Sequence, residues 1–335
     1  MRSRLSLLRR ASAAAALMTG ALVAPVLVAP AATAAETWPA RPVTVVVPFP
    51  PGGSTSIVAR IVTDGMAEAL GQSIIVDNRG GAGGALGTRQ VARSTPDGYT
   101  IALGYTGTLA IGPALFANAG YDVATDFTPI GRIGVAPSTV VVHPAFAVHS
   151  IAELIAYAKA HPGEVNYGSA GIGTVGHVAG EYFGIATGIR LTHVPYKGTG
   201  PAVTDLLGGH IPLSFTPIPA VHESARSGLL RMLAVTSLTR SSLAPDIPTV
   251  AEQGVPDFEA VLRYGLVAPA GTPRAAIARL DRALSAALAL APVRARLAVE
   301  GVEPDPGTPE QYQADIASEA ALWTKVIKAS GARAE

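Results

Sequence analysis

Residues 42–56 read PVTVVVPFPPGGSTS, an apolar, β-branched run that passes through prolines and two glycines into three hydroxyl residues. β-Branched residues favour strands, whereas Ser and Thr oxygens cap the first turn of helices. The pattern therefore predicts a strand over 42–47, a glycine turn and a helix start. Gly52 and Gly53 carry no Cβ, so the backbone there can come close to a ligand. The free N–H groups and the dipole of the new helix favour an anion, which makes a small anion site the first hypothesis.

The first 35 residues have the pattern of an export signal. Four arginines near the N-terminus precede an apolar, alanine-rich stretch over 11–30, and the small residues over 31–35 suit cleavage. We expect a signal peptide over residues 1–35 and a mature chain that starts near Glu36. A membrane anchor is the alternative reading, but two prolines in the stretch and the small residues after it disfavour an anchor.

The composition of the mature chain excludes several classes of protein. The whole chain has 25 Lys and Arg against 24 Asp and Glu; the signal carries four of the arginines and no acid, which leaves 21 against 24 and a charge near −3. This weak acidity, without a cluster of basic residues, gives no footprint for nucleic acid. The chain has no cysteine, so it has no lipidated cysteine, disulfide, thiolate ligand or cysteine nucleophile. We expect a soluble protein in the periplasm.

Strand-like and helix-like segments alternate from Arg41 onward, which is typical of sheets covered by helices. About 300 mature residues exceed one typical domain, and two alternating series each contain a glycine turn between a strand and a helix. We predict an α/β, two-lobe fold in which each lobe is a mainly parallel sheet flanked by helices. Lobe 1 comprises residues 36–137 and 261–335, and lobe 2 comprises 138–260.

The pattern also predicts the individual elements. The expected strands are 42–47, 73–76, 99–103, 139–142, 165–169, 191–196, 211–215 and 230–236. The expected helices are 55–70, 151–160, one that opens at 171–174, 200–207, 273–297 and 309–328. Residues 104–108 are expected to form a loop at the end of a strand.

The second glycine turn, Gly171-x-Gly173-x-x-Gly176, matches a dinucleotide-binding fingerprint in the correct context between a strand and a helix. That fingerprint needs an acidic residue about 20 positions further on, at the end of the next strand, to hold a ribose. Residues 192–197 occupy this place and read THVPYK, without an acid. We therefore expect no cofactor. A nucleotide-dependent enzyme that uses this turn remains the alternative.

Catalytic chemistry finds little support elsewhere in the chain. Ser169 lacks a G-x-S-x-G setting, and the seven histidines show no metal-binding spacing. We expect neither catalytic residues nor a metal, and a structural or ligand-contact role for His177. Instead, the chain offers backbone N–H groups and hydroxyls at two helix starts, with Thr106 nearby. A cleft between the lobes with such donors on both walls would hold a carboxylate without an arginine.

Eight segments spread over the mature chain carry a resemblance to a known family. They read WPARPVTVVVPFPPGGSTSIVAR, DNRGGAGGALG, PDGYTIALG, NYGSAGIGTVGHVAGEYF, HVPYKGTGPAVTDLLGGHIPLSF, LRMLAVTS, PDIPTVAEQGVPDFEA and GLVAPAGTPRAAIARL. Together they resemble the Bug family, the extracytoplasmic solute receptors of tripartite tricarboxylate transporters. The resemblance implies a Venus-flytrap fold that encloses a small organic acid, often a dicarboxylate or a related compound. It also implies that two glycine loops grip a carboxylate, partly through ordered water, and that separate membrane subunits perform the transport.

The resemblance implies a set of ligand-binding residues. The first loop contributes Phe49, Gly52, Gly53, Ser54 and Thr55; the second contributes Ala170, Gly171, Gly173, Thr174 and His177; Tyr105 and Thr106 line the floor; and Thr216 makes a distal contact. The expected partners are a carboxylate ligand and membrane subunits, with no nucleic acid, and the expected state is a monomer. A sensor accessory protein that presents its ligand to a signalling partner is a further alternative.

Three positions depart from the pattern of the family. Ser56 stands where many members have an acid, and Thr216-Pro217 stands where many have Asp or Asn, which argues against a ligand with an amino group. Arg263, ahead of Tyr264, replaces a more aromatic pair. Its guanidinium is expected either to pair a second carboxylate of the ligand or to lie on the surface.

Overall fold

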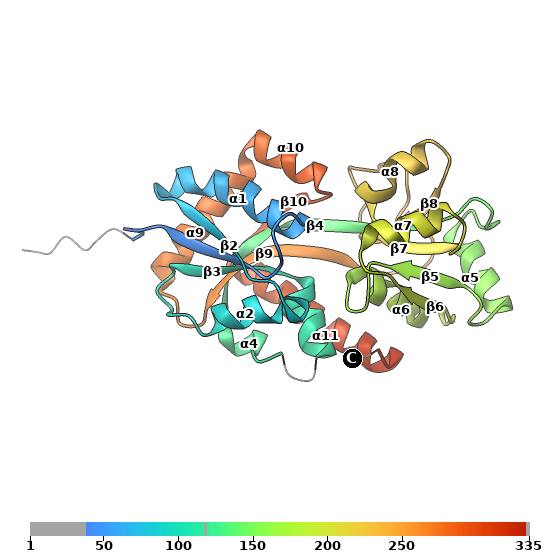
Figure 1. The fold of residues 1–335 in the computed structure, drawn as a ribbon, viewed down its shortest axis with the longest axis horizontal. Helices are drawn as coiled ribbons and strands as arrows, with labels where there is room; N and C mark the ends of the chain where they lie inside the picture. Colours follow the sequence, from blue (N-terminus) through green and yellow to red (C-terminus); the bar gives the residue numbers. More distant parts are fainter. Residues whose placement is uncertain (1–37, 117–118, 333–335) are drawn as a thin grey trace, which may run out of the picture. The chain divides into compact units, whose positions relative to one another are not determined.

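A mixed β-sheet with helices on its faces runs through the computed structural model, which describes residues 38–116 and 119–332 (Figure 1). The expected signal peptide, residues 1–35, lies outside these described residues. The predicted α/β class is confirmed, because strands and helices alternate over most of the described chain. None of the described helices is long and apolar enough to cross a membrane.

The first half of the sheet is built around residues 42–56. Strand β1 (Val43–Val47) pairs in parallel with β2 (Ile74–Asn78) and β3 (Thr100–Tyr105), as predicted. Helix α1 (Ser54–Leu70) follows the glycine turn and ends at Gly71, whose φ of 69° suits a residue without Cβ. The strand, turn and helix predicted from residues 42–71 are confirmed.

Two long strands connect the halves of the sheet (Figure 1). Strand β4 (Phe127–Val142) pairs antiparallel with β9 (Val261–Pro269) up to Pro137, and from Ser138 onward it pairs with other strands. The sequence predicted only residues 139–142 of β4 and no strand at β9. Prolines and glycines in the first part of β4 act as breakers in a sequence pattern, but here they coincide with bulges where the register shifts.

The second half of the sheet combines parallel and antiparallel strands. Parallel pairs join β5 to β6 and β5 to β7, whereas β7 and β8 run antiparallel to β4. The strands are β5 (Asn166–Ser169), β6 (Thr192–Pro195), β7 (Leu213–Pro217) and β8 (Arg231–Val235), and the helices are α5 (Ile151–Ala160), α6 (Val175–Thr187), α7 (Thr199–Leu207) and α8 (Ile218–Arg226). The predicted parallel pairing is confirmed for β5, β6 and β7. It is wrong for residues 139–142, which belong to β4 and run antiparallel to β7 and β8, so the sheet is mixed.

The prediction of a loop at 104–108 is wrong. β3 continues to Tyr105, and a π-helical turn (Gly107–Ile111) leads directly into α3 (Gly112–Leu115). Leu109, Ala110 and Ile111 are almost fully buried, so tertiary packing outweighs the loop signal of the glycines. The sequence also missed several short elements: a 3-10 turn (Ala82–Gly84), α2 (Ala85–Ala92), α4 (Val123–Asp126), α8 and β10 (Glu303–Gly307).

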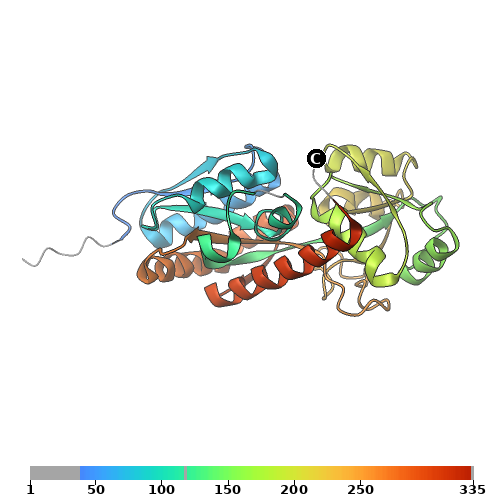
Figure 2. The same ribbon diagram turned by 90° about the horizontal axis from the view of Figure 1, so that it is seen from below.

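The C-terminal helices pack on both halves. α9 (Arg274–Ala289) and α10 (Ala291–Val299) cover the first half, with their apolar side chains in the same core as β1 and α1. α11 (Pro309–Ser330) runs from the first half toward the second (Figure 2). Its Tyr312 packs with β1 and β3, but its Trp323 packs with the core around β5 and α6. The predicted division assigned all of α11 to lobe 1, whereas its last turns pack on the second half.

The buried Thr236 links β4 to the segment before β9, where the chain passes between the two halves of the sheet. The Thr236 hydroxyl lies 3.0 Å from the Ser138 carbonyl and 2.8 Å from the Ala260 carbonyl, and it accepts the Ser138 N–H at 3.0 Å. Thr236 is fully buried. These contacts tie β4 to the segment that enters β9, at the point where β4 changes partners.

Candidate functional site

A cavity of about 400 Å³ lies where residues of both halves of the sheet meet. Its wall combines the starts of α1 and α6, the end of β3, the π-helical turn, and one residue at the end of α10. Loops at the carboxyl ends of strands are the usual place for ligands in α/β sheets, and this volume falls in the range of small-molecule sites.

The cavity brings eight of the thirteen predicted binding residues together. They are Phe49, Ser54, Thr55, Tyr105, Ala170, Gly173, Thr174 and Thr216. Gly52, Gly53 and Gly171 shape the two turns without lining the wall, while Thr106 and His177 lie behind it. The sequence missed other lining residues, among them Ser138, Phe215, Leu262, Tyr264 and Glu300. Ser138 and Thr216 face the cavity from β4 and β7, which only the strand pairing brings side by side.

The first glycine turn leaves two backbone donors at the cavity. The N–H groups of Ser56 and Ile57 donate to the Gly53 carbonyl at 2.9 and 3.1 Å. Within the described part of the chain, no hydrogen bond uses the N–H of Ser54 or Thr55, and both residues line the wall. These two N–H groups at the start of α1 are therefore available to a bound anion.

In the second glycine turn, the N–H groups of the two predicted binding residues Gly171 and Gly173 are already used within the protein. The Gly171 N–H donates to Ser169 Oγ at 3.1 Å, and the Gly173 N–H donates to His177 Nδ1 at 3.2 Å. Within residues 38–116 and 119–332, no group accepts the N–H of Ile172, Val175 or Gly176. These three residues line the cavity. The two glycines shape the turn, and their neighbours offer the donors. The position of Val175 and Gly176 in the first turn of a helix was the signal for this role.

Two stacked histidines support the second turn from behind. The rings of His177 and His193 lie 4.1 Å apart, and His193 Nε2 lies 2.7 Å from Ser169 Oγ. Burial lowers the pKa of His177 to about 4; burial and then the charge of His177 lower the pKa of His193 to about 3. Both imidazoles are therefore neutral at pH 7, and a neutral His177 can accept the Gly173 N–H through Nδ1. His177 thus acts on the cavity through the loop.

Aromatic rings form one side of the cavity. Phe49 meets Tyr105 edge to face at 5.3 Å between ring centroids, and Tyr105 stacks on Tyr264 at 6.3 Å. Burial raises the pKa of Tyr264 to about 12, with Glu300 adding to the rise and a hydrogen bond from Thr55 opposing it. The phenol therefore stays protonated near pH 7 and can donate a hydrogen bond.

Comparisons with known proteins match this arrangement. The family model described as the tripartite tricarboxylate transporter family receptor (TctC) matches residues 58–332. The chain belongs to this family. BugT from Bordetella pertussis is 41% identical over 304 residues, which cover 90% of this chain and 93% of BugT. The resemblance to the Bug family is thereby confirmed. The family model begins inside α1, so the first glycine turn lies outside the matched range.

Solved structures of other proteins show the same fold. A R. palustris structure with adipate is 38% identical with a TM-score of 0.74, covering 88% of this chain and 98% of that one. MatC from Rhodopseudomonas palustris with bound malate is 34% identical with a TM-score of 0.72, and the match covers 86% of this chain and 99% of MatC. The periplasmic binding protein BugD is 38% identical with a TM-score of 0.71, and the match covers 89% of this chain and 100% of BugD. These neighbours confirm the predicted resemblance to periplasmic binding proteins, and at the level of the family they are receptors and binding proteins.

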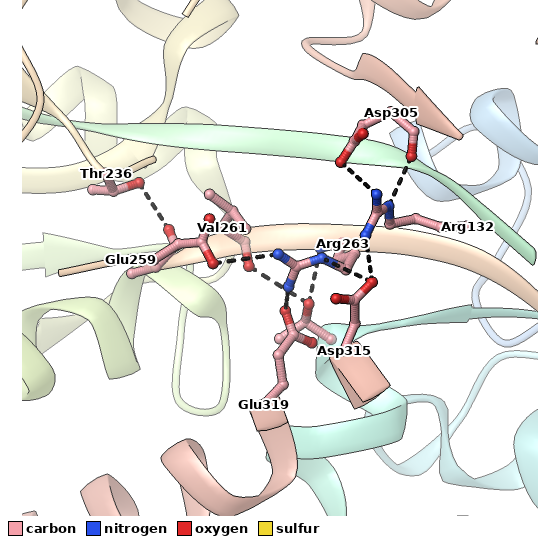
Figure 3. Close-up of polar contacts among 10 residues, drawn as sticks. Arg132, Thr236, Glu259, Val261, Arg263, Asp305, Asp315 and Glu319 are labelled. Carbon is pink, nitrogen blue, oxygen red and sulfur yellow. Dashed lines mark hydrogen bonds and ion pairs between the residues drawn. The ribbon is translucent and has the colours of Figure 1, made fainter. Parts of the chain in front are cut away.

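In this TctC-family chain, Arg263 lies on the face of β9 that points away from the cavity. Successive residues of a strand point to opposite faces, and Leu262 and Tyr264 line the cavity. The Arg263 side chain is 11% exposed and contacts Glu259 at 3.3 Å, Asp315 at 3.8 Å and Glu319 (Figure 3). Both expectations for Arg263 are wrong: its guanidinium does not reach the cavity, and it does not lie on the surface.

Thr106 joins this ionic cluster to the floor of the cavity. Its Oγ1 accepts the Arg263 backbone N–H at 2.8 Å, and its hydroxyl donates to the Val261 carbonyl at 3.5 Å. Thr106 is almost fully buried, so its hydroxyl is committed to β9. Among the described His, Asp and Glu residues, no group of three is placed to hold a metal ion.

Proposed function

We propose that this chain is a periplasmic receptor that captures a small organic acid by its carboxylate and delivers it to the membrane subunits of a tripartite transporter. Membership of the TctC family supports the role of receptor. The relatives solved with adipate and malate support a carboxylate as the group that is recognised. The cavity between the two halves of the sheet is the proposed binding site.

One observation carries the proposal: at two helix starts from different halves of the sheet, residues whose backbone N–H groups have no partner in the described chain line the same cavity. Ser54 and Thr55 contribute from α1, Val175 and Gly176 contribute from α6, and Ile172 contributes from the turn before α6. N–H groups at a helix start favour an anion, because the helix dipole adds to their hydrogen bonds. Hydrogen bonds to an ionised carboxylate are about twice as strong as those between neutral groups. A carboxylate at this place would be held from both sides.

The binding step would close two lobes around the ligand. We take lobe 1 as residues 36–137 and 261–335 and lobe 2 as 138–260. This division is supported by β4, which exchanges its pairing partners between Pro137 and Ser138. The Thr236 contacts lie at the same level and would act as a pivot, because hinge closure concentrates backbone changes in a few connecting residues. A clamp divided between lobes favours the closed form when the carboxylate binds to both walls.

Export would use the N-terminal segment. Residues 1–35 would be removed as a signal peptide, and the mature chain would start near Glu36. The description of BugD as a periplasmic binding protein supports this location. We expect the intact mass of the protein recovered from the periplasm of a producing cell to match a chain that begins within a few residues of Glu36. Recovery of the full-length chain from the membrane fraction would contradict cleavage.

The remaining parts of the proposal concern partners and chemistry. The receptor would act as a monomer, without nucleic acid, cofactor or catalytic step, and transport would be the task of separate membrane subunits. A sensor accessory protein with the same clamp is the second candidate. Genes for two membrane subunits beside that of the receptor would favour transport, whereas a neighbouring sensor kinase would favour sensing.

Calorimetry separates the receptor from the nucleotide-dependent enzyme. We expect at least one small carboxylate to bind with a dissociation constant of about 1–100 μM and NAD or ATP to show no binding, because β6 (Thr192–Pro195) has no acid for a ribose. The protein as purified is first unfolded and refolded to release any bound ligand. Nucleotide binding that a Gly173→Asp substitution removes would support the enzyme instead.

A further inference from the structure

The wall of the cavity is mostly apolar. Of the 25 described lining residues, thirteen are aromatic, aliphatic or proline. The aromatic ones are Phe49, Tyr105, Phe116, Phe215 and Tyr264. Three of these rings form one continuous surface, because Phe49 packs on Tyr105 and Tyr105 stacks on Tyr264. Such a surface suits the face or edge of another ring.

The cavity offers no positive charge for a second carboxylate. None of the described lining residues is Lys, Arg or His. Arg263 is adjacent in the sequence to two lining residues, but its guanidinium contacts Glu259, Asp315 and Glu319 on the opposite face of β9 (Figure 3). Outside the two helix starts, a buried second carboxylate would have no ionic partner and would depend on hydroxyls such as those of Ser138, Thr199 and Thr216 to offset its lost hydration, which is costly.

The one charged residue in the described wall has the wrong sign for a dianion. Glu300 ends α10 and lines the cavity. It lies close enough to Tyr264 to raise the pKa of its phenol. A negative group of the ligand near the aromatic wall would be repelled by Glu300, whereas an uncharged ring would not.

From this wall we infer that the ligand is a monocarboxylate with an apolar body of about the size of a substituted benzene ring. This inference rests on the proposed function, since it assigns the carboxylate to the two helix starts and the ring to the aromatic wall. Most of the binding energy then comes from burial of the ring, and the clamp sets the orientation.

Titration calorimetry with three probes tests the inference: benzoate, adipate and benzyl alcohol. We expect benzoate to bind at least tenfold more tightly than adipate, and benzyl alcohol to bind at least tenfold more weakly than benzoate. Adipate binding as tightly as benzoate would overturn the inference and leave the carboxylate receptor intact. Benzyl alcohol binding as tightly as benzoate would overturn the carboxylate clamp itself.

A charge reversal in the wall gives a second, independent measurement. Glu300→Arg should raise the ratio of the adipate affinity to the benzoate affinity about tenfold, mainly through tighter binding of adipate, because only adipate has an unpaired carboxylate to offer. The substitution should be tolerated, since a cation suits the end of a helix. Glu68→Arg, in the exposed last turn of α1, is the matched control and should change neither affinity. An unchanged adipate affinity in Glu300→Arg would contradict the placement of the ligand body against this wall.

Discussion

Gly53→Asp should abolish carboxylate binding and leave the protein folded. Gly53 is the N-cap of α1, with φ −82° and ψ 159°, and no heavy atom lies within 4 Å of the position that its Cβ would take. Aspartate is a favourable N-cap, so the fold should tolerate the substitution. The new carboxylate would compete for the free N–H groups of the clamp and repel the ligand. At about 5 Å and an effective dielectric constant of about 20, this repulsion is about 3 kcal/mol, or more than 100-fold in affinity.

Gly53→Asn separates the charge from the shape. Asparagine has nearly the same size and caps helices as well as aspartate, but it carries no charge. We expect Gly53→Asn to lose about tenfold in affinity, through competition for the N–H groups alone. Calorimetry with the tightest-binding carboxylate measures the affinity, and thermal unfolding checks the fold. If Gly53→Asp binds the ligand within fivefold of the native protein, the start of α1 does not hold the carboxylate.

The sequence predicts the first strand, turn and helix well because their signals are local. A β-branched run, two glycines and three hydroxyl residues lie within fifteen positions, and each favours the same structure, although the N-cap of α1 is Gly53 and no side chain caps the helix. The same holds for the helices α5 (Ile151–Ala160) and α7 (Thr199–Leu207), whose apolar residues recur with helical spacing.

The connecting strands could not be predicted in this way. β4 contains Pro129, Gly131, Gly134 and Pro137, and each of them weakens a strand in isolation. The strand forms because β9 and β10 pair with it from positions more than a hundred residues away. Long-range pairing of this kind leaves no local trace in the sequence.

The binding site was predicted in outline, and its details depend on packing. The two glycine turns could be found from their residues, but the choice of donors could not. Ser169 and His177 accept the N–H groups of Gly171 and Gly173, so the free donors belong to neighbouring residues. The direction of the Arg263 side chain was equally inaccessible, because it depends on a strand that the sequence did not reveal.

Arg263→Met should destabilise the protein by about 3–5 kcal/mol at pH 8, the usual cost of removing one partner from a buried ion pair. The native guanidinium contacts three carboxylates, and its side chain is 11% exposed. Methionine fills a similar length but leaves these carboxylates without their cation. Urea unfolding followed by circular dichroism gives the loss in the free energy of unfolding.

Arg296→Met provides the matched control. Arg296 pairs with Asp64 at 3.3 Å on the surface, where the two side chains are 53% and 65% exposed. Exposed pairs contribute about 0–1 kcal/mol, so this variant should stay within about 1 kcal/mol of the native protein at every pH. A similar loss in both variants would show that the Arg263 cluster contributes no more than a surface pair.

The pH dependence of the stability loss in Arg263→Met tests whether Glu319 is the carboxylate that is left unpaired. Burial raises the pKa of Glu319 to about 7, against the opposing attraction of Arg263. Without Arg263 this pKa rises further, so between pH 4.5 and pH 8 the folded variant binds a proton that the unfolded chain does not. Its stability then increases as the pH falls through this window, because protonation favours the state with the higher pKa. The deficit of Arg263→Met relative to the native protein should therefore be smaller at pH 5.5 than at pH 8. A deficit that does not change with pH would assign the loss to packing, since only a buried carboxylate can recover its stability by taking up a proton.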